Sequence, residues 1–205
     1  MNVREHWETI YTTKEPRTLG WRREHLDTSL ALIETLHLPV TAEILDVGCG
    51  ISTLVDDLLA HGSKQISLLD VSSSVLRTVR ERLGETEKRL SFIEGDVRTV
   101  QLDKARYDLW HDRAVFHFLT QPDERARYHA QVVRSLKLEG HVIIGVFSHE
   151  APPRCSGLPV QRYSVEELVE EFESDFTLQR CCGEMHITPG GVRQPYLYAH
   201  FLRTS

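Results

Sequence analysis

Excess positive charge, long apolar runs and cysteine motifs are all missing from this sequence. Lysines and arginines number 24 against 30 aspartates and glutamates, which leaves a formal net charge of −6. This balance argues against a general nucleic-acid-binding surface. No apolar run is long enough to span a bilayer, and the first residues lack the apolar core of a signal peptide. We therefore expect a protein that binds neither nucleic acid nor a membrane.

Cysteine occurs only at positions 49, 155, 181 and 182, without any Cys-x-x-Cys spacing. Cys181 and Cys182 are adjacent, so in a strand their side chains point to opposite faces and do not pair. Reduced thiols fit a cytoplasmic location best. No group of His, Cys and Asp has the spacing of metal ligands, so we expect no metal site.

The most informative motif is a strand that ends at Asp46 and runs into a turn with Gly48 and Gly50. A helix follows, with Ser52 as its expected N-cap, and the whole forms a nucleotide-binding corner. A dinucleotide fingerprint would need glycine at position 53, which is Thr53 here. The Asp46 carboxylate would oppose a pyrophosphate but attract a cationic amino group or sulfonium. S-adenosylmethionine carries such cationic groups and no phosphate.

Two further acids follow the next two apolar runs. Asp70 lies 20 residues beyond Gly50, an offset at which a carboxylate accepts hydrogen bonds from ribose hydroxyls. Asp96 is placed to receive the exocyclic amine of an adenine, with Val97 against the ring. Each acid alone could be a surface turn residue, but together with the glycine turn they favour one binding site.

At these residues the chain resembles the class I S-adenosylmethionine-dependent methyltransferases. The resemblance rests on residues 45–50, 69–70, 95–97, 107–109 and 136–140. It departs from the family's Leu-Lys-Pro-Gly-Gly turn at Leu138 and Glu139, and Ser52 replaces the third glycine of the family's loop. The resemblance implies a Rossmann-like α/β fold, a seven-stranded, mostly parallel sheet in the order 3-2-1-4-5-7-6 with an antiparallel last strand. It also implies S-adenosylmethionine as cofactor, with S-adenosylhomocysteine as product.

The expected cofactor-binding residues follow from the motif and the resemblance. They are Tyr11, Trp21, Asp46, Gly48, Cys49, Gly50, Asp70, Val71, Asp96, Val97 and His111. Tyr11 and Trp21 belong to an amino-terminal arm that we expect to fold over the cofactor as a lid, although aromatic residues there could equally cover the core.

Length and pattern indicate a single domain over residues 1–205. We expect a lid arm and helix over 1–40, a cofactor-binding core over 41–150, and a substrate-side loop, helix and closing hairpin over 151–205. The expected helices are 28–38, 52–61, 73–83, 122–136 and 164–173. The expected strands are 43–47, 65–70, 90–94, 107–111, 140–147, 175–182 and 194–203.

The methyl acceptor is predicted from other residues. Arg113 offers a fork for an anion, and Asp112 could orient it or act as a base, or the two could simply pair to hold the loop. Residues 110–113 resemble an element of thiopurine methyltransferases, and the carboxyl-terminal third is similar to the tellurite-resistance methyltransferases. That likeness makes His186 a candidate base or anion ligand and places Cys155 at the pocket mouth. Their simpler interpretations are a surface histidine and a buried apolar thiol.

Because both relatives act on sulfur, selenium or tellurium nucleophiles, we expect a small, soft, anionic acceptor. The expected protein is a monomer or homodimer. Three alternatives stay open: methylation of a protein lysine or another nitrogen or oxygen, cofactor binding without catalysis, and a nicotinamide dehydrogenase. Arg113 argues against an incoming ammonium, and Asp46 and Thr53 argue against the dehydrogenase.

Overall fold

The computed structural model describes residues 2–205. Its helices are α1 (Val3–Thr13), α2 (Asp27–Glu34), α3 (Leu54–Ala60), α4 (Ser73–Leu83), α5 (Pro122–Ser135) and α6 (Val165–Glu170), with short 3-10 helices η1 (Pro16–Thr18), η2 (Gly84–Arg89) and η3 (Phe116–Phe118). Its strands are β1 (Glu43–Val47), β2 (Gln65–Asp70), β3 (Ser91–Glu94), β4 (Tyr107–Arg113), β5 (Leu136–Phe147), β6 (Arg154–Cys155), β7 (Leu158–Pro159), β8 (Phe176–Ile187) and β9 (Arg193–Arg203).

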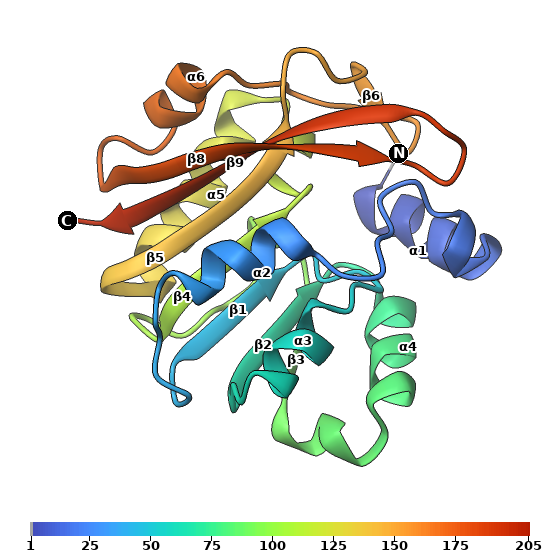
Figure 1. Ribbon diagram of the computed structural model, residues 1–205, viewed down its shortest axis with the longest axis horizontal. Coiled ribbons are helices and arrows are strands. Elements are labelled where there is room, and N and C mark those ends of the chain that lie inside the picture. The colour runs from blue at the N-terminus through green and yellow to red at the C-terminus, as the bar shows by residue number, and fades with distance from the viewer. Residues whose placement is uncertain (1) are drawn as a thin grey trace.

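Seven strands form one sheet in the order β3-β2-β1-β4-β5-β9-β8, drawn in Figure 1. The first five strands are parallel, and β9 runs antiparallel to both β5 and β8. With β8 and β9 as the sixth and seventh strands of this sheet, the predicted fold class and strand order are confirmed. The short hairpin of β6 and β7 forms a separate sheet that the sequence pattern did not predict.

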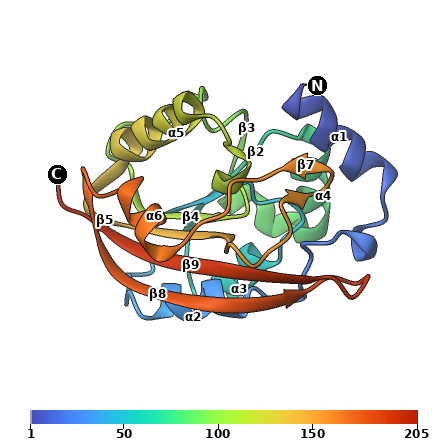
Figure 2. The same ribbon diagram turned by 90° about the horizontal axis from the view of Figure 1, so that it is seen from above.

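Helices cover both faces of the sheet, and each face has its own hydrophobic core. Figure 2 shows α5 on one side and α2 and α3 on the other. The α5 side buries aromatic residues such as Trp110 and Phe172, whereas the α2 side buries mainly leucine, isoleucine and valine from the strands and helices. Since β1 is covered on both faces, four of its five residues are buried, which explains its nearly continuous apolar sequence.

Local sequence signals place most element ends. The Ser72 side chain accepts a hydrogen bond from the Val75 N–H at the start of α4, and Gly84, with a φ of 54°, ends that helix. Pro122 opens α5, and Ser164 forms a capping box at α6.

Other expectations were wrong at their boundaries. The amino-terminal arm contains a helix, α1, which begins after an Asn2 cap. Strand β4 continues to Arg113, two residues beyond its expected end, β5 begins at Leu136, and β8 extends to Ile187. Helix α3 begins only at Leu54, so Thr53 is its N-cap residue rather than Ser52. In the part of the chain described here, no helix is long and apolar enough to cross a bilayer.

Candidate functional site

A cavity of about 330 Å³ opens at the carboxyl ends of the parallel strands, and we call it the main cavity. This is where open α/β sheets bind ligands, and the volume suits a small molecule. Helix α1 closes one side, next to α4, as Figure 2 shows. The loop after β4 and the hairpin β6–β7 supply other walls. The predicted residues that line it are Tyr11, Trp21, Gly48, Asp70, Val71, Asp96, Val97, Arg113 and Cys155.

The glycine turn needs both of its glycines. Gly48 and Gly50 have φ values of 60° and 52°, which favour glycine. A Cβ atom on Gly48 would lie 2.1 Å from the Val115 side chain, so the turn and the loop after β4 are in direct contact. The Gly50 N–H donates to Asp70 Oδ2 at 3.0 Å. The turn therefore shapes the cavity and orients its nearest carboxylate.

Asp70 lies at the end of β2 with its other oxygen held by the Ser72 N–H at 2.9 Å. Burial raises the pKa of this carboxyl to about 6, against the opposing effect of the two backbone N–H groups. Each carboxylate oxygen keeps acceptor capacity beyond its single N–H partner. The side chain is thus oriented toward the cavity and able to accept hydroxyl groups.

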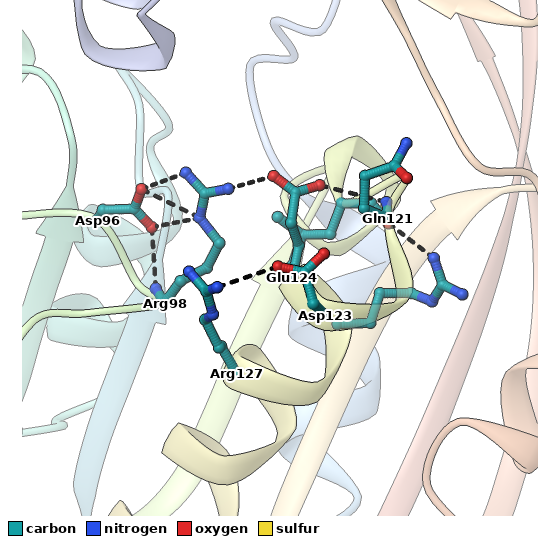
Figure 3. A network of polar contacts seen from close by, with 8 residues as sticks. Asp96, Arg98, Gln121, Asp123, Glu124 and Arg127 are labelled. Atoms are coloured by element: carbon teal, nitrogen blue, oxygen red, sulfur yellow. Dashed lines mark hydrogen bonds and ion pairs between the residues drawn. The ribbon is translucent and has the colours of Figure 1, made fainter.

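Asp96 and Val97 line the main cavity beyond Asp70. The Asp96 carboxylate contacts the Arg98 guanidinium, which also reaches Glu124 in α5, as Figure 3 shows. Partial burial would raise the pKa of Asp96, but the Arg98 hydrogen bonds outweigh it and lower that pKa. Sequence reasoning missed Arg98; the signal was a basic residue two positions after a strand-end acid.

Asp46, Cys49 and His111 do not line the main cavity. They line a smaller one of about 40 Å³ on the other side of the glycine turn, which shares Trp21, Gly48 and Arg113 with the main cavity. Asp46 Oδ1 lies 2.7 Å from His111 Nδ1, and His111 Nε2 lies 2.9 Å from the Ser29 hydroxyl. One Asp46 oxygen is therefore paired with the His111 ring, and the assignment of this carboxylate to a cationic ligand stays a prediction.

Aromatic side chains gather over the main cavity. Trp7 and Tyr11 of α1 meet Trp21 with ring centroids 5.5 and 5.9 Å apart, and Trp7 also meets Phe118 at 5.2 Å. The Tyr11 hydroxyl lies 3.0 Å from the position of a Cβ on Gly50. We call these four aromatic residues the lid, because they join α1 to the loop after β4 across the glycine turn.

Arg113 lies between the two cavities and lines both. Its Nε donates to the Tyr198 hydroxyl at 2.9 Å and its Nη1 to the Trp21 carbonyl at 3.1 Å, while the guanidinium lies 4.4 Å from the Tyr196 ring centre. Nη2 is buried and lies 3.6 Å from the Glu184 carboxylate, and within residues 2–205 it has no hydrogen-bond partner. The side chain is only 5% exposed, and Glu184 supplies a neighbouring negative charge.

Asp112 points away from Arg113, contrary to the expectation that it orients the guanidinium or acts as a base. Because β4 continues through both residues, their side chains alternate to opposite faces. The Asp112 carboxylate accepts the N–H groups of Val115 and Phe116 and the Tyr128 hydroxyl. Burial raises its pKa to about 6. Asp112 lines neither cavity and stabilises the loop after β4.

His186 also lies outside both cavities. Its Nε2 is 2.6 Å from the Gly20 carbonyl oxygen, and burial lowers its pKa. The ring therefore holds the segment that carries Trp21 rather than facing an acceptor. Cys155 does line the main cavity, and burial raises the pKa of its thiol.

The remaining cysteines lie away from the main cavity, and all four thiols are free. Cys181 and Cys182 are neighbours on the edge strand β8. Within residues 2–205, no group of three or more His, Cys, Asp or Glu side chains is arranged to hold a metal ion.

Comparison with known proteins gives matches to methyltransferases. The family described as "Methyltransferase domain" matches residues 44–140. The mouse eEF1A lysine and N-terminal methyltransferase is 26% identical over 85% of the chain. This chain spans about a quarter of that protein, 27% of its length.

Solved structures share the fold over nearly the whole chain. A structure described as "Conversion of a Disulfide Bond into a Thioacetal Group during Echinomycin Biosynthesis" has a TM-score of 0.79, 17% identity, and coverage of 99% of this chain and 93% of that one. The 1,6-didemethyltoxoflavin-N1-methyltransferase of Burkholderia thailandensis, with bound S-adenosylhomocysteine, has a TM-score of 0.73, 22% identity, and coverage of 99% and 88%. The family match over residues 44–140 thus includes the glycine turn and its three acids, and the chain has the fold of a methyltransferase solved with S-adenosylhomocysteine.

Proposed function

We propose that this chain transfers the methyl group of S-adenosylmethionine to a small, soft, anionic acceptor bound beside Arg113. Thiolates and selenium or tellurium anions belong to this class. The observation that carries the proposal is the Arg113 guanidinium, a buried cation among the residues that line the main cavity. A guanidinium binds anions through its fork of N–H groups.

Each part of the cofactor is assigned to one group of residues at the cavity. In our proposal Asp70 and Val71 bind the ribose region, Asp96 and Val97 the adenine, and Gly48 and Gly50 the turn beside the methionine part. The smaller cavity, with Asp46, Cys49 and His111, adjoins this last part through the turn. There Asp46 and His111 act by holding the end of β1 and β4 in shape.

The chain's own chemical task is alignment and exclusion of water. S-adenosylmethionine supplies an activated methyl group on its sulfonium. Arg113 orients the anionic acceptor, and the lid together with Leu158 and Pro159 gives the acceptor end apolar walls. His186 is a positioning residue in this scheme, because it binds the Gly20 carbonyl next to Trp21, whose own carbonyl accepts from Arg113.

The domain organisation supports the same proposal. Residues 1–40 carry Trp7, Tyr11 and Trp21 of the lid, residues 41–150 carry the cofactor-binding edge, and 151–205 carry Cys155 and the strands behind Arg113. We propose that the three parts form a single catalytic domain. Four free thiols favour a reducing compartment, for which we propose the cytoplasm.

Lysine methylation is the second candidate, because relatives of this chain are named as eEF1A lysine methyltransferases. The charges of the main cavity argue against it. Its acids Asp70, Asp96 and Glu124 lie on the adenosyl side, whereas the acceptor side beside Cys155 has Arg113 as its charged lining residue. An approaching ammonium would meet a positive charge there.

An acceptor panel tests the proposal. Purified protein is incubated with S-adenosylmethionine and, in turn, small thiols, selenite, tellurite, a thiopurine and eEF1A, and S-adenosylhomocysteine is measured. We expect turnover with a soft anion and a large loss in kcat/KM for Arg113→Met. Turnover on eEF1A alone would contradict the acceptor assignment while leaving the cofactor site intact.

Ligand-dependent melting separates the cofactor from the acceptor. S-adenosylhomocysteine should raise the melting temperature, because a ligand that binds only the folded state stabilises it, and NAD should not. A rise with NAD and none with S-adenosylhomocysteine would contradict the cofactor site. Arg113→Met should keep the rise, since its proposed partner is the acceptor.

A further inference from the structure

Arg98 lies in the wall of the main cavity, between Asp96 and Glu124, as Figure 3 shows. Its Nε is 2.9 Å from Asp96 Oδ1 and 3.1 Å from Oδ2, and its Nη2 also contacts Oδ2. Its own backbone N–H donates to Oδ1 at 2.9 Å. Among the described residues, Arg98 therefore supplies the hydrogen bonds that the Asp96 carboxylate accepts.

This arrangement uses most of the acceptor capacity of Asp96. A carboxylate accepts about four hydrogen bonds, and three N–H groups of Arg98 reach it: the backbone N–H at Oδ1, Nη2 at Oδ2, and the single Nε–H shared between both oxygens. The Asp96 side chain is 28% exposed and that of Arg98 19%, so water screens the pair less than it would on an open surface. An exocyclic amine that approaches Asp96 therefore competes with the guanidinium for these oxygens.

Glu124 offers the displaced guanidinium a second carboxylate. Arg98 Nη1 already contacts Glu124 Oε1, and Glu124 is held in place because its Oε2 accepts the Gln121 N–H at 3.2 Å. This second contact caps the start of α5. The guanidinium can thus leave Asp96 without losing every carboxylate partner.

We propose that Arg98 competes with the adenine amine for Asp96 and thereby weakens the binding of both S-adenosylmethionine and S-adenosylhomocysteine. The proposal rests on the assignment of Asp96 to adenine in the proposed function. Bound cofactor leaves Arg98 with Glu124, and departure of the product returns it to Asp96. The competition makes release of S-adenosylhomocysteine faster, which matters because the product keeps the whole adenosyl group.

Arg98→Met tests the competition, since methionine keeps an unbranched apolar stem and removes the guanidinium. The dissociation constant of S-adenosylhomocysteine, measured by calorimetry, should fall in this variant. A fall of about tenfold would mean that Arg98 holds Asp96 roughly nine-tenths of the time in the free protein. If the dissociation constant rises or stays the same, Arg98 supports the site instead and the proposal is wrong.

Two controls exclude general effects of charge or loosening. S-inosylhomocysteine has an oxygen in place of the exocyclic amine, so Arg98→Met should not improve its binding. Equal gains in affinity for both ligands would overturn the competition.

Arg127→Met removes a neighbouring arginine that pairs with Asp123 at 3.1 Å on the exposed face of α5. Figure 3 shows it directed to Asp123 rather than to Asp96, and it should leave affinity unchanged. The same gain in Arg127→Met would also overturn the proposal.

Asp96→Asn separates a failure of the competition from a failure of the cofactor site. When Asp96→Asn is added to Arg98→Met, S-adenosylhomocysteine should bind more weakly than it binds to Arg98→Met alone. The two proteins differ only in the Asp96 carboxylate. No weakening there would contradict the proposed adenine site itself. Weakening there, without a gain from Arg98→Met alone, would contradict only the competition. Melting temperatures without ligand verify that each variant is folded.

Discussion

Glu8 of α1 accepts a hydrogen bond from the Ser72 hydroxyl at 2.6 Å, and the Ser72 backbone N–H in turn donates to Asp70. The lid helix is therefore connected through a single residue to the carboxylate that we assign to the ribose. Burial would raise the pKa of Glu8, but the hydrogen bonds from Ser72, Ser73 and Ser74 together outweigh it and lower that pKa, so Glu8 stays ionised at neutral pH.

Glu8→Gln should speed the release of S-adenosylhomocysteine. The change keeps the shape of the side chain but removes the charge from the contact with Ser72, a loss of about 1 kcal/mol, or roughly fivefold in the rate of lid opening. Stopped-flow dissociation measures this rate. Glu5→Gln, at an exposed position of the same helix, is the matched control and should change little. Equal rates in all three proteins would contradict the role of this contact.

Cofactor affinity should fall as the pH is lowered through about 6. Burial raises the pKa of Asp70 from 3.8 to about 6, so the carboxylate takes up a proton in that range and loses capacity to accept ribose hydroxyls. The dissociation constant of S-adenosylhomocysteine, followed from pH 8 to 5, should rise in the wild type. The profile of Asp70→Asn should be weak and flat. A wild-type profile that is flat through pH 6 would exclude Asp70 from the binding step.

Protonation of Asp70 should affect the free energy of unfolding in the opposite direction, so that stability rises where cofactor affinity falls. Because the pKa of Asp70 is higher in the folded state, that state binds more protons between pH 3.8 and about 6. The contribution of this group to the free energy of unfolding therefore increases as the pH falls through that window. Asp112, with a pKa of about 6 from burial, contributes with the same sign. Urea unfolding of the wild type and Asp70→Asn at pH 5 and 7 isolates the Asp70 part.

Two neighbouring substitutions in β4 should separate stability from catalysis. Asp112→Ala leaves the N–H groups of Val115 and Phe116 and the Tyr128 hydroxyl without their acceptor, which should cost about 3 kcal/mol in the free energy of unfolding. Arg113→Met should instead reduce turnover with a smaller change in stability. Urea unfolding and initial rates measure the two effects.

Asp123→Ala is the control for Asp112. Its carboxylate pairs with Arg127 on the surface of α5, and an exposed pair of this kind contributes about 0.5 kcal/mol or less. If Asp112→Ala lowers the free energy of unfolding no more than Asp123→Ala does, the buried hydrogen bonds of Asp112 do not hold the loop.

Gly48→Ala and Gly84→Ala should differ although both glycines have positive φ values, 60° and 54°. At Gly84 nothing lies within 4 Å of an added Cβ, so only backbone strain of about 1–2 kcal/mol is expected. At Gly48 the Cβ would lie 2.1 Å from Val115, so the loop must move and cofactor affinity should fall as well. Calorimetry measures the dissociation constant of S-adenosylhomocysteine for both variants. Equal values would mean that the glycine turn tolerates the movement of the loop after β4.

The centre of the sheet was predictable because β1, β2 and β4 are buried along most of their length and therefore have apolar sequences. The bounds of β2 and α4 agree with the sequence prediction, since an apolar run and a glycine stop are local signals. Helix α1 was missed although Val3, Trp7, Ile10 and Tyr11 have helical spacing, because the prediction weighed its aromatic residues as a lid and not as one face of a helix.

Side-chain direction was the part of the site that sequence could not supply. An expected end of β4 at residue 111 made Asp112 and Arg113 loop neighbours, able to pair. Two more residues of strand send them to opposite faces, so a small error in a boundary reverses the role of a side chain. Arg98 was missed for a related reason, because no local pattern tells which carboxylate a long side chain reaches.

The position of β9 also connects the closing hairpin to the site. This strand follows β8 in the chain but lies inside it, against β5, and it carries the Tyr196 and Tyr198 rings that surround the Arg113 guanidinium. The hairpin lies outside the residues that carry the cofactor motif, yet it supplies the environment of the arginine to which we assign the acceptor. Changes in the hairpin should therefore alter the choice of acceptor more than the binding of cofactor.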